Sequence, residues 1–197
     1  MKRLSTISVF SLLILYYAAL TYAGGYSEKE QFLDDSNHLI KTLAQTLKHE
    51  LMAALKTGDL GAAVHTCHIS APTITENLNA SNTTTIKRTS LKWRNPNNKP
   101  DSWERAVLAK FAQQLDNGVA IEKLRFTEVI KSEEQTTYRH IKAIKTQDIC
   151  LVCHGPRDSL SDEIKQVLAE KYPDDLATGF SAGQLRGAFS ITRTITN

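Results

Sequence analysis

The sequence predicts an α+β fold built on an antiparallel sheet. Two observations indicate this class: helical periodicity dominates the first half of the chain, and strand-like runs with inserted helices follow it. The 197 residues are 41% hydrophobic, with 24 basic and 21 acidic side chains. This length and composition suit one domain, or at most two small ones, and exclude a disordered or collagen-like chain. A mean hydropathy of -0.30 excludes a polytopic membrane protein.

Residues 1–23 have the organisation of a secretory signal peptide. Two basic residues precede the apolar stretch 7–20, and small residues suited to cleavage follow it, ending at Ala23. The alternative is an uncleaved anchor in the inner membrane, because the stretch approaches the length that spans a bilayer. We expect residues 24–197 to form a single periplasmic domain. Removal of two cations lowers the net charge from +3 to +1, so we expect no nucleic-acid partner.

Two predicted helices follow the signal segment. Ser27 and the glutamate three residues later form a capping box, which opens a long amphipathic helix predicted to end near Gly58. A second helix is predicted from about Asp59, and Pro72 is expected to bend or end it. Cys67 falls on the apolar stripe of this second helix. Its side chain is therefore expected to point inward.

The rest of the mature chain alternates strand and helix signals. β-Branched residues with partial alternation indicate strands, and the stretch RNPNNKP indicates a loop. Caps and glycines delimit the helices. In chain order the predicted elements are a strand at 83–92, a helix from Asp101 to Gly118, strands at about 126–130 and 137–144, a helix at about 161–172, and a strand at about 187–195.

The three cysteines contain the most specific motif. Cys150 and Cys153 stand in the sequence CLVCH, which ends at His154, and an odd cysteine count excludes a closed disulfide framework. In an exported protein, C-x-x-C-H is the attachment site of a c-type haem. The two thiols form thioethers with the haem vinyl groups, and the adjacent imidazole binds the iron. We therefore expect one covalent haem c.

The cysteines are also compatible with other uses. A thioredoxin-like redox pair requires a βαβ context that the surrounding sequence lacks. A structural zinc site requires a second pair of ligands, for which only Cys67, with His65 and His68 beside it, is available. Cys67 itself suits either an iron ligand or a small buried apolar residue. Met52 precedes the motif, so the usual order of a His/Met cytochrome c is absent.

The sequence resembles the family of PAS-like c-type haem domains, formerly a domain of unknown function, whose type member is a cyanobacterial haem protein. The resemblance covers nearly all of the mature chain. It implies a PAS-like antiparallel sheet flanked by helices, with a long N-terminal helical part, and it implies His154 and Cys67 as the axial ligands of the iron. The matching residues are 67–72, 88–96, Asp101, Trp103, Glu104, 150–155 and 187–190.

These assignments suggest three functions. Two protein ligands leave no open position on the iron, which favours a redox or gas sensor that exchanges one electron, changes its axial ligand in response to carbon monoxide or nitric oxide, and signals to a partner protein. The alternatives are a periplasmic electron-transfer cytochrome and, third, a haem peroxidase. Arg88, Lys92 and Arg94 suit contacts with the haem propionates, or they form a solvated strand face.

Overall fold

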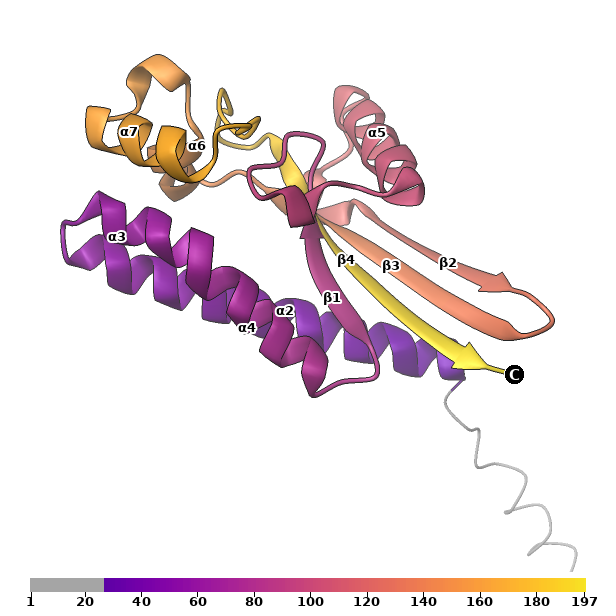
Figure 1. Cartoon of the computed structure of the whole chain (residues 1–197). Helices are drawn as coiled ribbons and strands as arrows, with labels where there is room; N and C mark the ends of the chain where they lie inside the picture. The colour runs from indigo at the N-terminus through magenta and orange to yellow at the C-terminus, as the bar shows by residue number, and fades with distance from the viewer. Residues whose placement is uncertain (1–26) are drawn as a thin grey trace, which may run out of the picture.

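A four-stranded antiparallel sheet is the centre of the structure, a computed structural model that describes residues 27–197. The signal-peptide prediction for residues 1–23 lies outside this range. The strand order across the sheet is β1-β4-β3-β2 (Figure 1). The predicted α+β class is confirmed. In that order the strands are β1 (Thr85–Thr89), β4 (Leu185–Thr196), β3 (Gln135–Lys145) and β2 (Arg125–Lys131).

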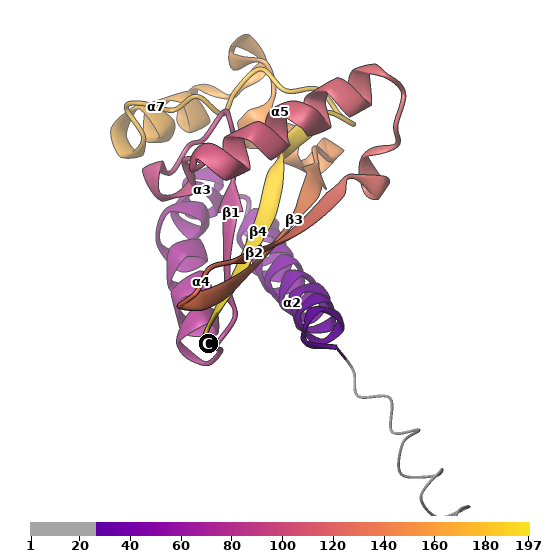
Figure 2. The same cartoon turned by 90° about the vertical axis from the view of Figure 1, so that its right-hand side faces the viewer.

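The long N-terminal helix α2 (Glu28–Lys56) covers one face of the sheet (Figure 2). It begins at the predicted capping box, where the Ser27 hydroxyl accepts a hydrogen bond from the backbone of Glu30. It ends just before Gly58, whose φ of 78° favours glycine. Its apolar stripe and the facing strand residues form one core cluster: Phe32, Leu39, Ile40, Leu43, Ile86, Tyr138 and Ile191.

A second helical segment runs back along α2 and forms a hairpin with it (Figure 1). This segment consists of α3 (Leu60–His65), a π-helical turn (Thr66–Ser70) and α4 (Ala71–Ala80). The sequence predicted that Pro72 would bend or end this helix. The helix does not end there, because the chain stays helical through Pro72 to Ala80. The wider turn before the proline changes the hydrogen-bond pattern, because the Ala71 N–H bonds to the Thr66 carbonyl five residues back.

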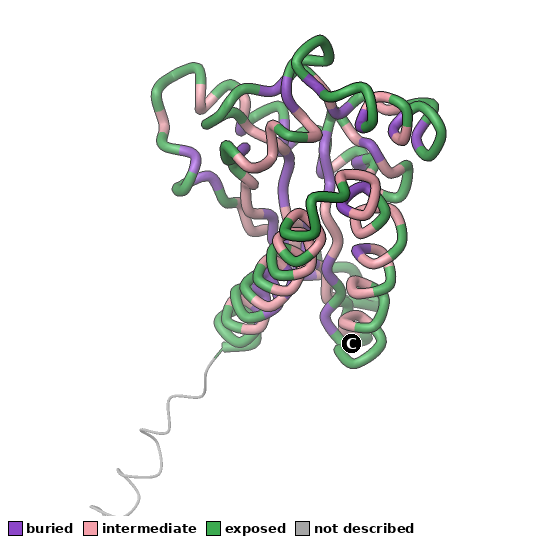
Figure 3. Tube along the Cα trace, turned by 90° about the vertical axis from the view of Figure 1, so that its left-hand side faces the viewer, coloured by how far each residue is buried: buried purple, intermediate pink, exposed green. Residues whose placement is uncertain are grey.

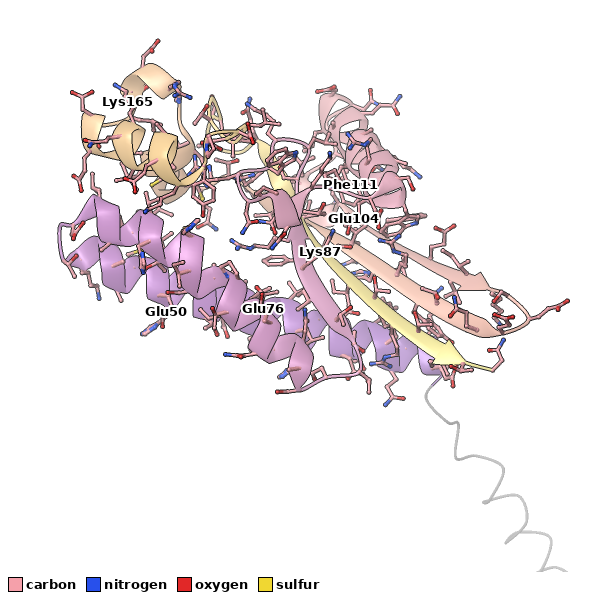
Figure 4. The ribbon with its side chains drawn as sticks, in the orientation of Figure 1. Glu50, Glu76, Lys87, Glu104, Phe111 and Lys165 are labelled. Atoms are coloured by element: carbon pink, nitrogen blue, oxygen red, sulfur yellow. The ribbon has the colours of Figure 1, made fainter. Side chains whose placement is uncertain are left out.

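Helix α5 (Ser102–Asp116) covers part of the opposite face of the sheet. Asp101 caps it as predicted, and Glu104 completes a second capping box. The Glu104 carboxylate is buried and lies 3.1 Å from the Lys87 ammonium on β1, so it also ties the helix to the sheet (Figure 4). Apolar side chains from α5, β3 and β4 form the second core cluster.

Two further helices lie beyond one end of the sheet. These are α6 (Leu151–His154) and α7 (Asp162–Lys171), and α7 packs against α3. The buried residues follow the strands and the inward faces of the helices (Figure 3). Of the helices within residues 27–197, none combines the length and apolar character needed to cross a membrane.

Candidate functional site

A cavity separates the helical hairpin from the C-terminal segments and contains most of the predicted site residues. Cys67, Cys150, Cys153 and His154 all line it, although Cys67 is far from the other three in the sequence. Its empty space, including the open side, is about 860 Å³. Apolar walls come from Leu51 and Leu55 of α2 and from Trp93, Ile144, Ile149 and Val152.

Cys67 lies in the π-helical turn, which sets the direction of its side chain. A π turn contains one residue more than an α turn, which rotates the side chains after it relative to those before it, and such turns are frequent at functional sites. Cys67 is half-buried and lines the cavity. His68 instead contacts the ring of Tyr172 edge-on, with ring centroids 5.0 Å apart. His65 is exposed, and neither histidine lines the cavity.

The C-x-x-C-H segment forms a helical turn beside the cavity. A 3-10 turn (Asp148–Cys150) leads into α6, so Cys150 and Cys153 lie three residues apart on one side of a helix. Both thiols are free. Burial raises the pKa of the Cys153 thiol to about 11. Both thiols line the same cavity, and Cys153 does so as a protonated thiol.

His154 is held in one orientation by a main-chain carbonyl. Its Nδ1 lies 2.6 Å from the Ala177 oxygen, and a carbonyl only accepts, so Nδ1 carries the proton. The lone pair of Nε2 is then available to a metal. Burial, with help from the Arg186 and Arg94 charges, lowers the pKa of His154 well below its usual value. The ring is neutral, as a ligand must be.

The predicted cationic residues occupy different places. Arg88 and Arg94 line the cavity, whereas Lys92 does not: its ammonium donates to the Thr178 carbonyl and lies 4.5 Å from the centroid of the Phe180 ring. A third cavity-lining arginine, Arg186, was missed by the sequence reasoning. It stands just before the predicted last strand, and no local pattern distinguishes it from a solvated cation.

Comparison with known proteins identifies the family. The model of the Tll0287-like family (Tll0287) matches residues 26–193. The chain belongs to the Tll0287-like family. This confirms the resemblance to a family typified by a cyanobacterial haem protein. Among curated proteins, none matches the chain.

A solved structure supports the fold of this Tll0287-like chain. The crystal structure of the cyanobacterial heme-protein Tll0287 superposes with a TM-score of 0.60 at 24% sequence identity. The match covers 84% of this chain and 96% of the other. At 24% sequence identity this likeness is evidence for the fold alone.

The side chains of this Tll0287-like cavity suit a c-type haem. They combine two thiols for the vinyl groups, a neutral imidazole whose Nε2 is free of the proton, and a second sulfur donor in Cys67. Apolar residues line one part of the cavity and guanidinium groups another, as an amphipathic macrocycle with two carboxylates requires. The donor set therefore fits the group that the sequence motif predicts.

Proposed function

We propose that this protein is an exported monohaem c-type haem protein that acts as a redox or gas sensor in the periplasm. One observation carries the proposal: Cys67, Cys150, Cys153 and His154 line a single cavity. The family and the name of the similar heme-protein support it. The output of the sensor passes to a partner protein.

Cys150 and Cys153 hold the haem covalently. Each S–H adds across one vinyl double bond, so that a carbon–sulfur bond forms and the hydrogen goes to the neighbouring vinyl carbon. The helical spacing of the two cysteines presents both thiols to one edge of the ring. His154 then binds the iron through Nε2, because its Nδ1 proton is engaged by Ala177.

Cys67 would hold the iron as a second protein ligand beside His154, and it would be the ligand that changes when the protein senses its signal. Bound haem supplies one-electron chemistry between ferric and ferrous iron. Cys67 binds as a thiolate, since coordination to a cation deprotonates a thiol, and its negative charge stabilises the ferric state. In the reduced protein Cys67 would be the ligand that is exchanged for carbon monoxide or nitric oxide.

Two measurements test this function. Produced with a c-type maturation system, the protein should begin near Gly24 and exceed its polypeptide mass by one haem. Joint replacement Cys150→Ala and Cys153→Ala should abolish covalent haem. A mature mass without haem overturns the proposal.

Ferric electron paramagnetic resonance tests the axial pair. Cys67→Ala should retain covalent haem but change the spectrum from a low-spin thiolate type to high-spin iron or to another ligand. His68→Ala, adjacent but outside the cavity, should keep the wild-type g-values. Identical g-values in wild type and Cys67→Ala would exclude sulfur ligation, and His65, His68 and Met52 would be tested next.

A further inference from the structure

Three guanidinium groups line the cavity, but one carboxylate accompanies them. Arg88, Arg94 and Arg186 are all cavity residues. Arg94 donates to Asp175, with 2.9 Å between Nη2 and Oδ2. Within residues 27–197, neither Arg88 nor Arg186 forms an ion pair. Two positive charges beside the cavity therefore lack a partner of opposite sign.

The two unpaired arginines belong to neighbouring strands. Arg88 lies on β1 opposite Phe189 of β4, and Arg186 lies near the start of β4. Arg186 uses one nitrogen, Nη1, to donate to Ser90 Oγ at 3.2 Å and to the Lys92 carbonyl at 3.1 Å. Its other two nitrogens have no partner in the described part of the chain. The guanidinium of Arg88 likewise donates to no described residue.

The environment of these arginines is unfavourable for isolated cations. Burial lowers the pKa of Arg88, and burial together with the Arg94 and Arg88 charges lowers the pKa of Arg186 to about 10. Like charges held close together in a partly buried site repel and lose hydration. An anionic ligand of charge minus two removes the repulsion, and its carboxylates replace the lost water as hydrogen-bond acceptors.

We propose that Arg88 and Arg186 together form the binding site for the two propionate groups of the haem. The inference rests on the proposed function and refines it, since it adds Arg186 and gives Arg94 and Lys92 another role. Arg94 is engaged by Asp175 and by the Cys153 carbonyl at 2.7 Å. Lys92 is held by Thr178 and Phe180 away from the cavity.

The charge balance of the haem-bound site supports the assignment of Arg88 and Arg186 to the propionates and of Arg94 to Asp175. Ferric iron in its porphyrin carries one positive charge, which the Cys67 thiolate cancels. The two propionates cancel Arg88 and Arg186, and Asp175 cancels Arg94. A ferric haem thus makes the site neutral, whereas reduction leaves one negative charge close to the two arginines. Both arginines therefore favour the reduced state and raise the midpoint potential.

The test compares holoprotein variants by mass and by midpoint potential as a function of pH. Arg88→Gln and Arg186→Gln should retain covalent haem, lower the potential at neutral pH, and raise the apparent pKa of propionate titration by about one unit or more. Arg88→Lys and Arg186→Lys should restore most of both effects, because they keep the charge. Lys92→Gln removes a cation outside the cavity and should leave the pH profile at the wild-type position.

The outcomes separate this inference from the proposed function. Attached haem with unchanged pH profiles in both arginine-to-glutamine variants overturns the arginine site while leaving the haem assignment intact. An equal shift in Lys92→Gln also overturns it, since the effect would then report net charge alone. A wild-type protein without haem overturns the proposed function itself.

Discussion

Arg94 and Asp175 form a buried ion pair that connects the C-x-x-C-H segment to the loop that contains Ala177. Their side chains are 7% and 5% exposed. The Arg94 guanidinium also donates to the Cys153 carbonyl, and the second oxygen of Asp175 accepts from the Ala177 N–H at 2.8 Å. Ala177 in turn holds the imidazole of His154. The pair therefore supports the loop that orients this histidine.

Loss of the Asp175 charge should destabilise the protein. Asp175→Asn leaves the Arg94 guanidinium buried without its counter-charge, which costs about 3 kcal/mol of unfolding free energy. Chemical denaturation of the two proteins measures the difference. Asp174→Asn is the matched control, since Asp174 is exposed and its replacement should change stability by less than about 0.5 kcal/mol. Equal losses of unfolding free energy in the two variants would show that the ion pair between Arg94 and Asp175 does not stabilise the fold.

Gly187 should not tolerate a side chain. Its φ is 155°, and a Cβ there would lie 2.3 Å from the Thr89 carbonyl oxygen, so Gly187→Ala must displace β1 from β4. Gly183 provides the control because its φ is 88° with nothing within 4 Å of a Cβ. Gly183→Ala should cost about 1 kcal/mol from backbone strain, and Gly187→Ala about 1–3 kcal/mol more from the clash. Similar melting shifts in the two variants would contradict this account.

His140 should make the fold sensitive to acid. It is 3% exposed, and burial, with smaller effects from Lys142 and Arg125, lowers its pKa from 6.5 to about 4. The unfolded chain then binds this proton more tightly, so the contribution of His140 to stability is constant well above pH 6.5 and is lost as the pH drops towards 4. The loss by pH 4.5 should be about 2–3 kcal/mol.

Urea titrations at pH 7 and pH 4.5 measure this contribution. His140→Gln should remove this contribution and so reduce the difference between the two pH values. His49→Gln should retain the wild-type difference, because the His49 side chain is 82% exposed. A His140→Gln protein with the full wild-type loss would assign the acid sensitivity to another group.

The class of function should appear in reactions with small ligands. Two protein ligands on the iron predict hydrogen peroxide turnover little above that of free haem. The ferrous protein should bind carbon monoxide or nitric oxide only with loss of a ligand, whereas Cys67→Ala should bind carbon monoxide faster. Optical spectra of both oxidation states follow these changes. Rapid saturable peroxidase turnover would favour an enzyme, and an unchanged ligand pair on reduction would favour an electron carrier.

Local interactions explain why the sequence predicted the elements well. The caps at Ser27 and Asp101 are contacts between residues three apart, and Gly58 and Gly118 end their helices through their own backbone angles. Strand alternation likewise involves near neighbours. The C-x-x-C-H motif is readable for the same reason, since its chemistry depends on spacing within one helical turn.

The amino-acid sequence by itself determined the α+β class, the helix starts and the motif from Cys150 to His154, because each depends on neighbours along the chain. Only the tertiary structure decided that Cys67 lines the same cavity, that Arg186 joins Arg88 there, and that Lys92 does not. Those positions depend on how the π-helical turn packs and on which residues of β1 and β4 face the cavity. Such contacts join distant segments, and no local period or cap encodes them.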